Sequence, residues 1–102
     1  MSEDLLARLA DCQAAMIRAL DGAEAAVVEA AAEDLRAAIE AVRRAGLTPE
    51  AIDRERLSDL ADQANAAQAR VNFLTDRIAR HVAGLAAARG VAADTTYRRG
   101  AR

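Results

Sequence analysis

Apolar residues recur every three or four positions through most of the chain, which is the spacing of one face of an α-helix. The first run follows Ser2, a natural N-cap, and two acidic residues that suit the positive end of a helix dipole. It predicts a helix over residues 3–20, with an apolar stripe that comprises Leu5, Leu6, Leu9, Cys12, Met16, Ile17 and Leu20.

The second run begins after Asp21-Gly22, where the periodic pattern is interrupted. Asp21 and Glu24 have the spacing of a capping box, and Gly46 fits a helix C-cap. A helix is therefore predicted over about residues 23–45, with an apolar stripe that comprises Val28, Ala31, Leu35, Ala38 and Val42. A single kinked rod through both runs is the alternative, because one glycine inside a helix costs only about 1 kcal/mol.

The third run follows Leu47-Thr48-Pro49-Glu50, in which Thr48 fits an N-cap and Pro49 fits the first helical position. A long helix is predicted over residues 50–89, ending at Gly90, with a length of roughly 60 Å at 1.5 Å per residue. Its apolar seam alternates three and four residues apart, as the a and d positions of a coiled coil do. The seam comprises Leu57, Leu60, Ala64, Ala67, Val71, Leu74, Ile78, His81 and Leu85.

Together the three runs predict an all-α fold, an antiparallel bundle or coiled coil of three helices with the last one long. β-Branched residues form no alternating run, so a sheet is not expected. The helical domain is predicted to span residues 1–90. The periodicity stops after Gly90, and residues 91–102, which end in a basic sequence, are predicted to form a flexible tail.

Composition adds limits on the location and the class of the protein. The chain has 102 residues, 29 of them alanine, so strong helix propensity is combined with a thin apolar core. A net charge of −2 argues against a dedicated nucleic-acid binder, and no apolar run approaches the roughly 20 residues that span a bilayer. The acidic N-terminus lacks a secretory pattern and Cys12 is the only cysteine, so a cytoplasmic location is expected.

Catalytic motifs are absent from the sequence, and we expect neither an enzyme nor a bound cofactor or metal. A di-iron site in a helical bundle needs paired Glu-x-x-His motifs, but His81 is the only histidine and neither Ile78 nor Gly84 is acidic. Cys12 lies on the apolar face of the first helix, where a small core residue is the simplest interpretation.

The most informative segment is Val71-Asn72-Phe73-Leu74. Val71 and Leu74 lie on the seam, whereas Asn72 and Phe73 fall at b and c, the positions that face away from a coiled-coil partner. Two explanations for an outward Phe73 stay open: another helix of this chain or of a second subunit covers the ring, or the ring belongs to a hydrophobic groove that binds a partner helix.

Three features of the sequence resemble those of the FlgN family of flagellar type III export chaperones. The block Leu20-Asp21-Gly22-Ala23-Glu24 is similar to the family's break between two amphipathic helices. Asn72 within Val71-Asn72-Phe73-Leu74 is similar to the Asn-containing segment of the family's last helix, and Tyr97 with Gly100 is similar to its C-terminal tail. This chain departs from the family in being shorter, in having Phe73 where many members have Gly, and in having Arg98 after Tyr97.

The resemblance implies a cytoplasmic chaperone that binds the C-terminal helices of hook-filament junction proteins and delivers them to the export apparatus. A groove in the last helix would hold the amphipathic cargo helix, and Tyr97 in the tail would contact the export gate. The partner-binding residues that this interpretation predicts are Val71, Asn72, Phe73, Leu74, Ile78, Val82, Leu85 and Tyr97. The alternatives are a structural coiled-coil protein that forms a homo-oligomer and a regulator that sequesters a partner protein through the same surface.

Overall fold

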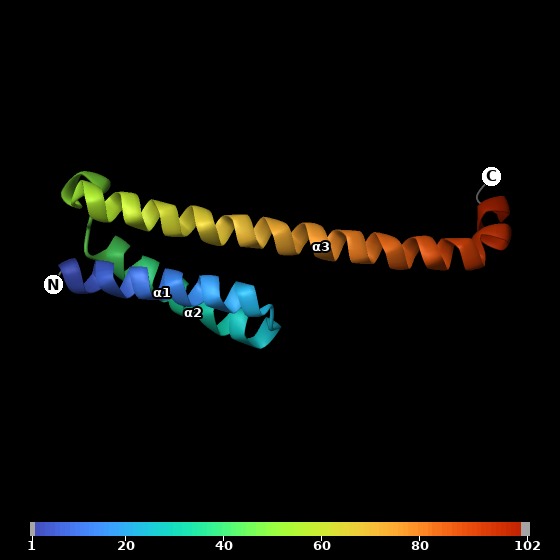
Figure 1. The fold of residues 1–102 in the computed structure, drawn as a ribbon, viewed down its shortest axis with the longest axis horizontal. Coiled ribbons are helices and arrows are strands. Elements are labelled where there is room, and N and C mark those ends of the chain that lie inside the picture. The colour runs from blue at the N-terminus through green and yellow to red at the C-terminus, as the bar shows by residue number, and fades with distance from the viewer. Residues whose placement is uncertain (1, 101–102) are drawn as a thin grey trace. The chain divides into compact units, whose positions relative to one another are not determined.

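The computed structural model describes residues 2–100, and it describes side chains for residues 3–90. The described backbone is all-helical, as predicted, with helices α1 (Ser2–Gly22), α2 (Ala25–Arg44) and α3 (Arg54–Gly100) and a short 3-10 turn, η1 (Pro49–Ala51) (Figure 1). It divides into two compact units, Met1–Val71 and Asn72–Arg102, and α3 contributes residues to both.

α1 and α2 are separate helices that pack side by side as an antiparallel hairpin, so the single kinked rod does not form (Figure 1). The chain reverses at Ala23, which has a left-handed φ of 55°, and at Glu24, whose backbone is extended. The predicted capping box is wrong. Glu24 makes no side-chain cap bond, and the Asp21 carboxylate accepts a hydrogen bond from Arg70 instead.

The turn between α1 and α2 leads to a stability prediction. A left-handed conformation is unfavourable for a residue with a Cβ atom and is readily adopted by glycine. We expect Ala23→Gly to raise the free energy of unfolding by about 0.5–1 kcal/mol, after allowing for the greater freedom of glycine in the unfolded chain. Gly46→Ala is the opposing control, because Gly46 has a φ of 72°. Urea denaturation would contradict the prediction if both variants shifted stability in the same direction.

The end of α2 confirms the predicted glycine cap. The amide of Gly46 donates to the carbonyl of Arg43 at 3.0 Å, and the amide of Leu47 donates to the carbonyl of Val42 at 3.4 Å. These two bonds form a Schellman motif around a residue with positive φ, and they satisfy carbonyl groups that have no partner within the helix.

The start of the third helix differs from the prediction. Thr48 makes no side-chain cap bond and precedes only η1, after which Ile52 is extended. α3 instead begins at Arg54, and the Asp53 carboxylate accepts a hydrogen bond from the amide of Arg56 at 3.3 Å. Asp53 is therefore the N-cap, because its side chain satisfies an amide of the first helical turn.

The unit Met1–Val71 is a three-helix bundle in which successive helices run in opposite directions. Arg56 near the start of α3 pairs with Glu3 near the start of α1, and Arg70 further along α3 pairs with Asp21 at the end of α1. These two pairs show that α1 and α3 run parallel within this unit. Its core is thin, and half of its buried residues are alanine: Leu6, Ala19, Leu20, Ala31, Ala38 and Leu60.

α3 continues beyond its predicted end. The backbone remains helical through Gly84 and Gly90 as far as Gly100. Neither of these glycines breaks the helix, because each costs only about 1 kcal/mol within segments rich in alanine. The predicted flexible tail, residues 91–102, lies outside the residues whose side chains are described.

Candidate functional site

Four apolar side chains share one face of α3 beyond Val71. They lie within an arc of about 80° around the helix axis at 3.6 residues per turn. We call this set the α3 stripe, which comprises Leu74, Ile78, Val82 and Leu85. Leu74 is half-buried, whereas Ile78, Val82 and Leu85 are 63%, 56% and 51% exposed. Large aliphatic side chains this exposed on neighbouring turns are typical of a surface that binds a partner.

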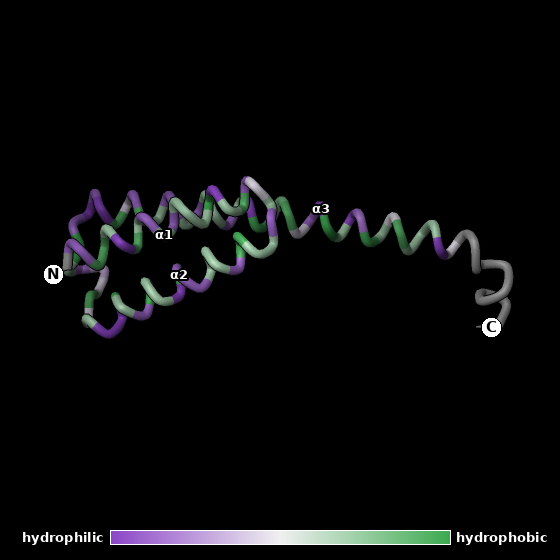
Figure 2. Tube along the Cα trace, turned by 90° about the horizontal axis from the view of Figure 1, so that it is seen from below, coloured by the Kyte–Doolittle hydropathy of each residue, from purple (hydrophilic) through white to green (hydrophobic). Residues whose placement is uncertain are grey.

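The stripe continues a pattern that begins earlier in the same helix. Leu57 and Leu60 occupy equivalent seam positions within the three-helix bundle, where Leu57 is half-buried and Leu60 is only 7% exposed. Figure 2 shows hydrophobic positions recurring along the part of α3 that carries its label. The seam is therefore buried at Leu60 and exposed at Ile78, although the residue types hardly change.

Phe73 does not lie on the stripe. Its ring is 64% exposed, and it lies about 140° around the helix axis from the centre of the stripe at 3.6 residues per turn. Asn72 lies about 120° from the centre of the stripe in the opposite sense and is exposed. Four of the eight predicted partner-binding residues thus share a face, and Asn72 and Phe73 lie on other sides of the helix. Val71 is the last residue of the unit Met1–Val71 and is half-buried. Tyr97 lies outside the residues whose side chains are described.

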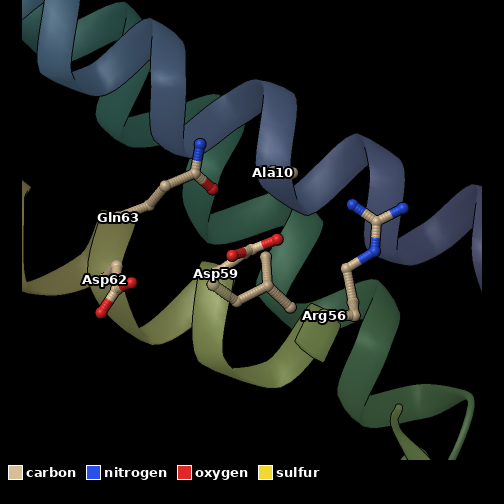
Figure 3. A pocket seen from close by; sticks show the side chains of 6 residues that line it. Ala10, Arg56, Asp59, Asp62 and Gln63 are labelled. Carbon is tan, nitrogen blue, oxygen red and sulfur yellow. The ribbon is translucent and has the colours of Figure 1, made fainter. Parts of the chain in front are cut away.

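A shallow depression in the three-helix bundle is a second place to look for chemistry. It has a volume of about 390 Å³, and its lining residues are Ala10, Arg56, Asp59, Leu60, Asp62 and Gln63. Arg56 and Gln63 extend from α3 toward α1, whereas Asp62 points away (Figure 3). Arg56 is already paired with Glu3, and the two aspartates are exposed. This lining offers no nucleophile beside a base, so we assign no reaction to it.

The remaining chemical candidates are isolated from one another. Cys12 is a half-buried free thiol in α1, and His81 is exposed on α3. Within the part of the chain that is described, no group of three or more His, Cys, Asp or Glu side chains could hold a metal ion. No helix in the same part combines the length and the apolar character needed to cross a membrane.

Arginines beside the seam were not among the residues predicted for the site. With Val71 and Ile78 at a, positions 56, 70 and 77 are all g, and each holds an arginine. A g residue flanks the contact stripe of a coiled coil and sets the charge that a neighbouring helix meets. The heptad assignment alone is enough to identify the repeated arginine at position g. The ion pairs of Arg56 and Arg70 with α1 show what an arginine at this position does.

Comparison with known proteins yields no relative. No protein-family model matches the chain, and no curated protein and no solved structure matches it.

Proposed function

We propose that this protein is an export chaperone that binds an amphipathic helix along the α3 stripe. The observation that supports this proposal is the exposure of Ile78, Val82 and Leu85 on one face of a helix. Exposed aliphatic side chains at helical spacing fit the helix-in-groove mode of peptide recognition, in which the apolar face of one helix covers that of another.

The physical properties of the stripe suit a reversible carrier. A terminal helix that later assembles into a coiled coil has an apolar stripe, which would associate prematurely if nothing covered it. The surface around Leu85 is rich in alanine, so the contact buries little area per turn and the affinity is moderate. A chaperone needs this balance, because it must release its cargo for export.

The resemblance to the FlgN family supplies the identity of the cargo in this proposal. The cargo is the C-terminal helical segment of a hook-filament junction protein, held in the cytoplasm before delivery to the export apparatus. The segment Val71-Asn72-Phe73-Leu74 carries that resemblance within the described part of the chain. In the same proposal, Tyr97 contacts the export gate and the protein has no catalytic role.

Alanine substitutions test the location of the binding site. We expect Ile78→Ala to weaken binding of the cargo helix about tenfold, because it removes buried apolar carbon atoms from the centre of the contact. Val27→Ala is the matched control, since Val27 is a similarly exposed aliphatic residue on α2, and it should leave the Kd unchanged. Isothermal titration calorimetry with the C-terminal segments of hook-filament junction proteins measures both.

The substitution Phe73→Ala tests whether the opposite side of α3 contributes to binding of the cargo helix. We expect a change in Kd below about threefold, because a single visiting helix on the stripe cannot also reach this ring. If no junction-protein segment binds and sedimentation shows a stable dimer or tetramer, the result would contradict the chaperone proposal. It would support the alternative, a structural coiled-coil protein that forms a homo-oligomer.

A further inference from the structure

The chemistry of the helix that fits the α3 stripe can be read from the arginines beside it. Within the three-helix bundle, Arg56 pairs with Glu3, and Arg70 Nε donates to Asp21 Oδ1 at 2.7 Å. Both arginines are at position g of α3, and both carboxylates belong to α1. The helix that accompanies the first part of α3 therefore combines an apolar face with acidic residues at its edge.

Arg77 occupies position g one heptad after Arg70. It flanks Leu74 and Ile78 of the stripe. Among residues 3–90, no carboxylate lies within ion-pair distance of Arg77. The neighbouring Asp76 is already paired with Arg80 at i,i+4.

The balance of charge along the chain agrees with this local arrangement. Residues 72–102 contain six arginines and two acidic residues, whereas residues 1–71 contain eight arginines and fourteen acidic residues. The stripe thus lies in the basic part of an acidic protein. A basic partner would meet repulsion there, and opposite charge at the edge of a contact favours both encounter and register.

We infer that the occupant of the α3 stripe is an acidic amphipathic helix that places a carboxylate against Arg77, as α1 places Asp21 against Arg70. This inference rests on the proposed function, because it requires that the stripe bind a helix. A lipid surface fits less well, because Phe73 is exposed on the side of α3 that would face away from the bilayer.

Two synthetic helical peptides test the inference on the full-length chain. They share the same apolar residues and differ only in the residues beside them, which are glutamate in one and lysine in the other. We expect the glutamate peptide to bind more tightly at low salt, and Arg77→Glu to weaken its binding about fivefold and to improve that of the lysine peptide. Fluorescence anisotropy measures each Kd, and 0.5 M salt should remove the preference because it screens exposed charges.

Arg80→Glu is the matched control. It makes the same change in net charge on the same segment, but position 80 lies on the side of α3 away from the stripe, so the preference for glutamate should persist. Equal binding of the two peptides, with loss of both in Ile78→Asp, would overturn the acidic-helix inference and leave the docking site standing. If neither peptide binds, and the chain instead binds phosphatidylserine vesicles or forms a dimer that Ile78→Asp dissociates, both the inference and the proposed function are overturned.

Discussion

A chain truncated after Val71 is expected to fold with unchanged stability and, under the proposed function, to lose affinity for the cargo helix by about a hundredfold or more. Every buried side chain among residues 3–90 precedes Val71, so the truncation removes none of the core. It does remove Leu74, Ile78, Val82 and Leu85, which form the α3 stripe. If the stripe binds the cargo helix as proposed, stability and binding belong to different parts of the chain, and one deletion should separate them.

Circular dichroism during heating and calorimetry with a junction-protein segment measure the two properties. A chain truncated after Gly90 is the control, because it retains the whole stripe and should keep its affinity. The separation would be disproved if truncation after Val71 abolished the cooperative thermal transition, since the three-helix bundle would then depend on residues beyond it.

Leu60→Ala is expected to lower the free energy of unfolding by about 2–4 kcal/mol, because it leaves a cavity where α3 meets the hairpin. Leu60 is the only buried residue that α3 contributes among the described residues. A core of this size rarely supplies more than about 3–5 kcal/mol, so the substitution should remove most of the stability of the bundle.

Leu85→Ala makes the same chemical change at a side chain that is 51% exposed. We expect it to change stability by less than about 0.5 kcal/mol, as exposed substitutions usually do. Urea denaturation followed at 222 nm compares the two variants. Similar losses in both would mean that Leu85 is covered in the free protein and that the stripe is not available for a partner.

Local sequence signals predicted the helices well, and they failed where competing caps were present. Gly46 was identifiable because a positive φ at the end of α2 suits glycine. The break after α1 was predicted near Gly22, but the left-handed residue is Ala23, which no propensity favours. Likewise, Thr48 precedes a proline and looks like a cap, yet Asp53 caps α3 because the extended Ile52 separates η1 from the long helix.

The candidate site was predictable in its periodicity and not in its environment. Helical spacing alone places Val71, Ile78 and Leu85 on one face, and it places Phe73 away from that face. Spacing does not show which seam residues other helices cover, because Leu60 and Leu85 have the same side chain and yet one is buried and the other is exposed. Burial of this kind is a tertiary property.

Every described residue from Thr75 to Gly90 is exposed. Substitutions on this stretch therefore carry almost no penalty for folding, apart from those that break a helix. In the proposed chaperone, natural variation can then change which cargo helix is recognised while the folded bundle stays intact. Proteins lack this freedom when the same residues form both the core and the binding surface.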